Sequence, residues 1–124
     1  MSDVLLWLYL INSILLINHE IDSAYWKEWE LFKLPGGITG FLLLHFPLLF
    51  FILWGLILLS RHSPWAPTFS LLLCLGGIFA FTIHTYFLRK GRPEFNKPIS
   101  KLMLKSILIV SITQLASTLY LIIA

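Results

Sequence analysis

The chain has 124 residues, of which 58% are hydrophobic and only 12% are charged. Soluble domains carry roughly 25% charged residues, so this composition excludes an ordinary water-soluble domain and indicates one transmembrane domain over residues 1–124. The single cysteine, Cys74, excludes an internal disulfide and a cysteine-rich zinc site, and the sequence has no phosphate-binding glycine loop or serine-nucleophile motif.

Four apolar segments are long enough to cross a hydrocarbon layer of roughly 30 Å, which takes about 20 helical residues. The predicted helices cover residues 4–22, 38–59, 66–88 and 99–124. Proline and glycine clusters separate them, as at Pro35-Gly36-Gly37. The segments lack the alternation of barrel strands. The predicted fold class is therefore all-α, an integral membrane bundle of four transmembrane helices.

Basic residues are distributed unevenly between the two ends of these helices. Arg61 is the only Lys or Arg beside the termini and the 60–65 turn. The others flank the 20–37 and 89–98 connections: Lys27, Lys33, Arg89, Lys90, Arg92, Lys97, Lys101 and Lys105. The positive-inside rule predicts a multi-pass protein of the cell inner membrane with both termini outside. The expected partner is the lipid bilayer and not nucleic acid, with a larger membrane complex or a homo-oligomer left open.

Four of the six acidic residues lie in the short block 18–30. There His19, Glu20 and Asp22 place three titratable groups in four positions, and the i, i+3 spacing puts His19 and Asp22 on one helix face. Ionisable residues within a span normally face protein or water and mark a functional site. We therefore expect these three residues to be catalytic acid–base groups.

Two further histidines fall at the same depth as His19. At about 1.5 Å of rise per residue, His19, His45 and His84 share one layer just inside the cytoplasmic leaflet. Imidazoles and carboxylates that converge from several helices are typical of metal sites in bundles. The sequence thus predicts a metal site made by His19, Asp22, His45 and His84, with zinc, iron or manganese as the candidate ions.

Structural interpretations of the same residues stay open. Each buried histidine could be hydrogen-bonded to a backbone carbonyl or to a Ser or Thr of a neighbouring helix. Lys27, Glu28 and Glu30 are expected in a solvated turn. Asn12 and Gln114 lie deeper and are expected to hydrogen-bond between helices.

Three classes of function fit these observations. The first is a metal or acid–base site at the cytoplasmic leaflet that acts on a lipid-like substrate. The second is a non-catalytic accessory subunit of a larger membrane complex, so whether the protein is an enzyme stays open. The third is a haem or pigment-binding bundle with His45 and His84 as axial ligands.

The order of motifs in residues 12–50 carries a resemblance. His19-x-x-Asp22 is followed by Glu28-Trp29, by Pro35-Gly36-Gly37 and then by His45. This order resembles small uncharacterised bacterial membrane proteins and is similar in outline to the HXXEE group, named for a His-x-x-Glu-Glu motif. Ser23 stands where that motif has its second acid. The resemblance implies a four-helix membrane protein and carries no activity with it.

Overall fold

The computed structural model describes residues 3–124, and helices are the regular elements throughout that range. The elements are α1 (Asp3–Tyr25), α2 (Glu28–Leu31), α3 (Gly37–Ser60), α4 (Ala66–Arg89) and α5 (Pro98–Ile123). The helices α1, α3, α4 and α5 are each long and apolar enough to cross a membrane. The prediction of an all-helical protein with four long apolar helices is confirmed.

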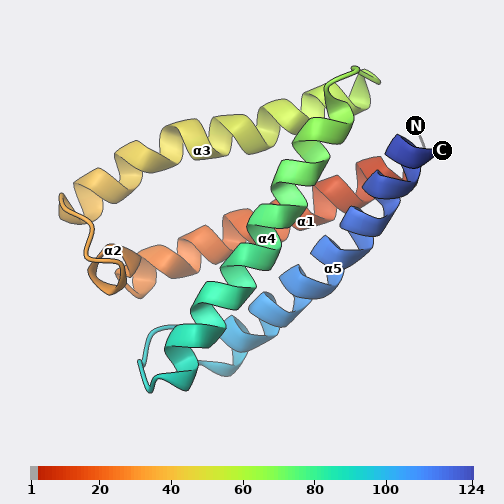
Figure 1. Cartoon of the computed structure of the whole chain (residues 1–124). Helices are drawn as coiled ribbons and strands as arrows, with labels where there is room; N and C mark the ends of the chain where they lie inside the picture. The colour runs from red at the N-terminus through yellow and green to blue at the C-terminus, as the bar shows by residue number, and fades with distance from the viewer. Residues whose placement is uncertain (1–2) are drawn as a thin grey trace.

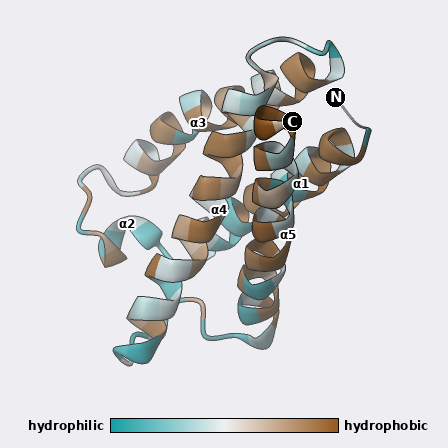
Figure 2. Ribbon diagram, turned by 45° about the vertical axis from the view of Figure 1, so that its right-hand side comes forward, coloured by the Kyte–Doolittle hydropathy of each residue, from teal (hydrophilic) through white to brown (hydrophobic). Residues whose placement is uncertain are grey.

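The long helices divide into a tightly packed group and one splayed helix. Helix α5 packs along both α4 and α1, whereas α3 has less contact with α1 and α4. Figure 1 shows α3 and α4 meeting at the turn that joins them and diverging toward the end that carries α2. In Figure 2 the long helices are largely hydrophobic, and hydrophilic residues gather at α2 and at the α4–α5 connection.

A buried polar network joins α1, α4 and α5. Asn12 Nδ2 donates to Gln114 Oε1 at 2.8 Å and to Ser111 Oγ at 3.1 Å. Gln114 Nε2 donates to the Ser70 carbonyl oxygen at 3.0 Å, and the Ser70 and Thr118 hydroxyls lie 2.8 Å apart. The expected hydrogen bonding by Asn12 and Gln114 is confirmed. Such bonds help apolar helices associate in a medium where hydrophobic burial does not.

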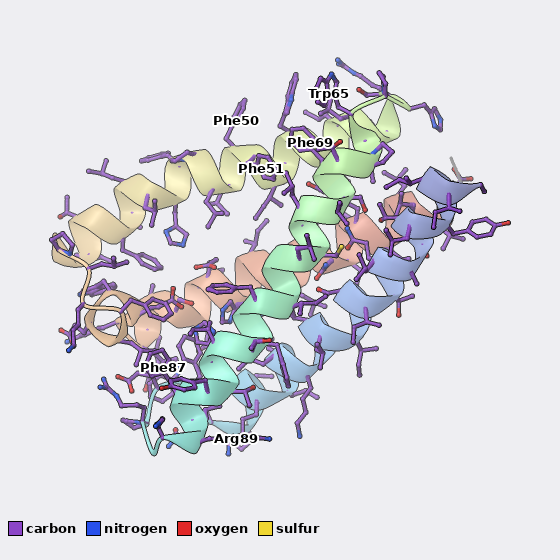
Figure 3. The ribbon with its side chains drawn as sticks, viewed as in Figure 1. Phe50, Phe51, Trp65, Phe69, Phe87 and Arg89 are labelled. Atoms are coloured by element: carbon purple, nitrogen blue, oxygen red, sulfur yellow. The ribbon has the colours of Figure 1, made fainter. Side chains whose placement is uncertain are left out.

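Helix α3 meets the rest of the bundle mainly in the half that leads to α4. The Tyr9 hydroxyl of α1 donates to the Ile52 carbonyl oxygen at 2.8 Å. Phe51 of α3 stacks on Phe69 of α4 with ring centroids 4.6 Å apart. Figure 3 shows these two rings between α3 and α4, while Phe50 points away from the bundle. The contacts hold α3 at this point and leave its other half apart from α4.

The end of the bundle that carries α2 is closed by an aromatic cap, which we define as Trp26, Phe32 and Phe95. Phe95 is 1% exposed and packs with Leu31 and Leu104, and Trp26 and Phe32 pack against the same cluster. Lys27 begins α2 in the left-handed conformation, with φ 54°. This conformation turns the chain sharply after α1, so α2 lies against the end of the bundle.

Two adjacent glycines in α4 serve different purposes. A Cβ at Gly77 would overlap Ser111 Oγ and would lie 3.1 Å from Ile107 Cγ2, both on α5. A Cβ at Gly76 would meet nothing within 4 Å. Gly77 therefore permits the close approach of α4 and α5, whereas the space beside Gly76 is open.

We expect Gly77→Ala to destabilise the protein by about 1–3 kcal/mol through overpacking at the α4–α5 contact. Gly76→Ala is the matched control and should be neutral, or more stable by up to about 1 kcal/mol, because alanine favours helix. Thermal unfolding in detergent, followed by circular dichroism, measures the difference. Equal unfolding temperatures for the two variants would contradict the packing role of Gly77.

Candidate metal centre

Three side chains from three elements converge at the α2 end of the bundle. His19 of α1, Glu28 of α2 and His84 of α4 each present one ligand atom, and these atoms all lie within 4.8 Å of one another. The imidazoles of His19 and His84 are buried and meet edge to face, with ring centroids 4.7 Å apart. We call these residues the His19–Glu28–His84 group.

The backbone of α4 fixes the orientation of His84. His84 Nδ1 lies 2.7 Å from the carbonyl oxygen of Ala80, one helical turn earlier. A carbonyl oxygen can only accept, so Nδ1 carries the hydrogen and donates it. The other ring nitrogen, Nε2, lies 2.9 Å from Glu28 Oε2. The ring therefore presents Nε2 to the centre of the group.

His45 of α3 repeats this arrangement with a different carboxylate. Its Nδ1 lies 2.6 Å from the Phe41 carbonyl oxygen, again one turn earlier. Its Nε2 lies 2.7 Å from Glu20 Oε2 of α1. The His45–Glu20 contact is thus a polar link between the splayed α3 and α1.

Hydrogen-bond chemistry determines how many protons these contacts hold. With Nδ1 donating to a carbonyl, each Nε2···Oε2 contact needs exactly one further proton. That proton lies on the imidazole or on the carboxyl group, and in both cases the pair is neutral as a whole. A neutral pair is far less costly to bury than an isolated charge. A metal ion bound between Nε2 and Oε2 would take the place of that proton.

Glu28 has a second donor beside His84. Ser23 Oγ lies 2.8 Å from Glu28 Oε2 and donates to it. Burial alone would raise the pKa of Glu28, but the hydrogen bonds from His84 and Ser23 outweigh burial and hold this pKa below its ordinary value. These hydrogen bonds favour the carboxylate form of Glu28, which is the form that binds metal ions.

His19 has unused capacity for a hydrogen bond or a metal. The residue is 1% exposed, and its Nδ1 has no hydrogen-bond partner among the described residues. Buried polar atoms nearly always have a partner, and leaving one unpaired costs roughly 1–3 kcal/mol. The His19 ring lies beside His84, and an unpaired nitrogen on that ring is a feature that a bound ligand or ion would explain.

The site residues predicted from the sequence fall into two contacting sets in the structure, and one predicted residue lies outside both. His19 and His84 come together with Glu28, and His45 comes together with Glu20. Asp22 lies outside the His19–Glu28–His84 group, and its buried Oδ2 has no partner in residues 3–124. Metal binding by Asp22 or His45, and catalysis by His19, Glu20 or Asp22, stay predictions.

Glu28 is the residue that the sequence-based interpretation missed, because it was expected in a solvated turn. The structure corrects this: the Glu28 side chain is part-buried and bonded to His84 and Ser23. The reason is the left-handed Lys27, which sends α2 back against the bundle. One signal in the sequence could have indicated Glu28. Three histidines lie in apolar segments and their ring nitrogens need hydrogen-bond partners, which Glu20 alone cannot provide.

An apolar cavity of about 270 Å³ adjoins the group. Its polar wall consists of His19, Glu20, Glu28 and His84. The rest of its lining is apolar and comes mainly from α3 and α4: Leu16, Phe32, Leu48, Phe51, Ile52, Leu72, Leu73, Gly76, Phe79, Ala80 and Ile83. The two carboxylates and the two imidazoles therefore face one common apolar space.

In metal-free protein, the depressed pKa of Glu28 makes stability depend on pH. A carboxyl group whose pKa is lower in the folded state stabilises the fold above its unfolded value, and that contribution is lost as pH falls through the folded value. We expect the unfolding temperature to fall below about pH 4.5, and to fall less steeply in Glu28→Gln. Glu30→Gln, at an exposed position of the same short helix, should follow wild type. Identical pH profiles for all three proteins would contradict the Glu28 contacts.

Comparison with known proteins gives a family and no activity. No curated protein and no solved structure matches the chain. One family model matches residues 5–121, and nothing supports the resemblance to the HXXEE group in particular. Because the match covers nearly the whole chain, the protein belongs to DUF6713, a family of unknown function.

Proposed function

We propose that the His19–Glu28–His84 group binds one divalent metal ion, zinc by preference, and that the protein uses it for hydrolysis inside the membrane. The observation that carries this proposal is the convergence of three ligand atoms from α1, α2 and α4 within 4.8 Å of one another. Two imidazoles and one carboxylate are the ligand set of many catalytic zinc sites, and also that of non-haem iron(II) sites.

The dimensions of the group suit a small metal ion. Zinc binds nitrogen and oxygen at about 2.0–2.2 Å, so the ligand atoms of a tetrahedral site are about 3.4 Å apart. His84 Nε2 and Glu28 Oε2 are already 2.9 Å apart, so the longer separations, of at most 4.8 Å, involve His19, and closure needs shifts of roughly 1–1.5 Å between His19 and the other two ligands. The bond from His84 Nδ1 to the Ala80 carbonyl is the kind of outer contact that orients metal-binding histidines.

Three protein ligands leave a fourth position for water, which zinc activates as a nucleophile near neutral pH. Glu20 lines the same cavity and is bonded to His45 at 2.7 Å. This pair is placed to accept and return a proton beside the metal, which is the role of a general acid–base group. The arrangement supports metal-assisted hydrolysis with His45–Glu20 as the proton-transfer pair.

The orientation in the inner membrane is part of the proposal. Eight of the nine basic residues flank the two connections at the α2 end, and Arg61 alone lies at the other end. This asymmetry supports a topology with the α2 end in the cytoplasm and both termini outside. The metal centre then lies near the cytoplasmic leaflet.

We expect detergent-purified protein, incubated with zinc and desalted, to retain about one zinc per chain by elemental analysis. His84→Ala and Glu28→Gln should weaken zinc binding by more than about 100-fold, since they remove ligands and not only supporting contacts. His19→Phe should also lose zinc, yet unfold at an equal or higher temperature, because it removes a buried imidazole nitrogen without a partner.

Two variants serve as controls for this experiment. Glu30→Gln and His62→Ala change exposed residues and should bind zinc as wild type does. Wild-type protein that retains no zinc, iron or manganese would refute the metal centre. Co-purification of such metal-free protein with one fixed partner would support the accessory-subunit interpretation, and a Soret absorption band would support the haem interpretation.

The topology can be tested with single cysteines in a Cys74→Ala background. We expect an impermeant thiol reagent on intact cells to label Ser63→Cys, in the turn between α3 and α4, and not Asn96→Cys, between α4 and α5. Permeabilised cells provide the control, since both positions should then react. Labelling of Asn96→Cys alone in intact cells would reverse the proposed orientation.

A further inference from the structure

The cavity beside the metal centre has two chemically different ends. One wall carries the imidazoles and carboxylates of His19, Glu20, Glu28 and His84, and the remaining lining is almost entirely apolar. At its far end Phe51, which stacks on Phe69, limits the space. A ligand that matches this cavity has a polar head at one end and a hydrocarbon chain at the other.

The cavity opens sideways, between α3 and α4. Three of its large lining side chains are also exposed on the surface of the helices: Leu48 by 38%, Leu72 by 49% and Phe79 by 65%. Gly76 lies between the last two on α4, is exposed and leaves open space where a side chain would stand. In a membrane this face of the apolar helices α3 and α4 meets lipid.

On the side of the aromatic cap, by contrast, the two histidine rings are covered. The Phe95 ring lies 4.2 Å from the His84 ring and 5.4 Å from the His19 ring, centroid to centroid. Phe32 of the same aromatic cap lies 6.0 Å from His84. A ligand therefore reaches the two histidines more directly from the lipid between α3 and α4 than past the aromatic cap.

The volume sets the length of chain that fits. An apolar cavity of about 150 Å³ is enough to bind benzene. At about 30 Å³ for each water-sized group, the cavity of about 270 Å³ holds on the order of nine such groups. This is the size of one medium-length alkyl chain, so one chain at a time fits inside the cavity.

We propose that the substrate is a single-chain amphiphile, an acyl ester or amide, whose chain enters laterally between α3 and α4 and whose carbonyl group lies at the His19–Glu28–His84 group. This inference rests on the proposed hydrolytic function for the role of the head group. The proposed binding site for the alkyl chain, which we call the chain seat, is inferred from the cavity alone. Hydrolysis adds water across the acyl bond, releasing a carboxylic acid and an alcohol or amine.

Photo-crosslinking tests where the chain lies. The probe is methyl decanoate with a diazirine in the middle of its chain, added to the full-length protein in phosphatidylcholine vesicles, with crosslinks mapped by mass spectrometry. We expect saturable crosslinks at Phe51, Leu72 and Leu73 that excess unlabelled methyl decanoate removes. Gly76→Phe, which fills the opening, should reduce them at least 10-fold.

Matched variants make the outcome decisive. Ala116→Phe adds the same side chain at an exposed position of α5 and should leave the crosslinks unchanged. Leu48→Trp narrows the opening from α3 and should act like Gly76→Phe, which guards against a folding defect in either variant. Crosslinks that spread evenly over lipid-facing residues, or that persist in both filled variants, would overturn the chain seat.

His84→Ala separates the two proposals. If the metal centre is correct, this variant loses zinc and ester hydrolysis while keeping the saturable crosslinks. If wild type binds no metal and yet shows the saturable crosslinks, the proposed hydrolytic function fails and the chain seat stands. If wild type binds zinc and shows no saturable crosslinks, the chain seat fails and the metal centre stands.

Discussion

The centre depends on one kind of hydrogen bond, in which the Nδ1 hydrogen of a histidine is donated to a backbone carbonyl oxygen of the same helix. In His84 and His45 the Nδ1 hydrogen goes to the carbonyl oxygen one turn earlier, at 2.7 and 2.6 Å. Each bond fixes the ring and directs Nε2 toward a carboxylate. In hydrocarbon no water is available to replace such a partner, so the position of Glu28 and Glu20 follows from the position of the two rings.

The same requirement explains why the bundle is compact on one side and open on the other. The deep network around Asn12 and Gln114 joins α1, α4 and α5, and it leaves α3 out. Helix α3 is held to α1 by two long-range hydrogen bonds: one from Tyr9 in the half of α3 that leads to α4, and one between His45 and Glu20 in the half nearer α2. Because both bonds join α3 to α1, α3 and α4 diverge from the turn that connects them (Figure 1). The cavity lies between these two helices.

The sequence predicts the four long helices well because length and apolar composition are local properties. It also predicts those residues of the group whose depth follows from their position along a helix. His19 and His84 follow from helix depth, and Glu20 from its place in the acidic block. Asp22 is offset from His19 by about 60° around the helix, since three residues make about 300° of turn, and spacing and depth alone do not decide whether it joins the group. It lies between Asn18 and Trp26 on the face whose side chains bond to Met103 and Ser100 of α5. Glu28 could not be placed, since its position depends on one left-handed residue, Lys27.

Charge balance links the two histidine–carboxylate pairs. Each pair holds one proton and is neutral, so the buried centre without metal carries little net charge. A divalent ion bound by His19, Glu28 and His84 would displace the proton between His84 and Glu28, and the ion and its ligands would then carry one positive charge. Metal affinity must therefore rise with pH. The excess charge is removed if a water on the ion, or the neighbouring His45–Glu20 pair, gives up a proton. In an apolar cavity this neutralisation is strongly favoured, because an uncompensated buried charge is costly. In the proposed metal centre the second pair would thus act as a proton store beside the ion, which a single histidine–carboxylate pair would lack.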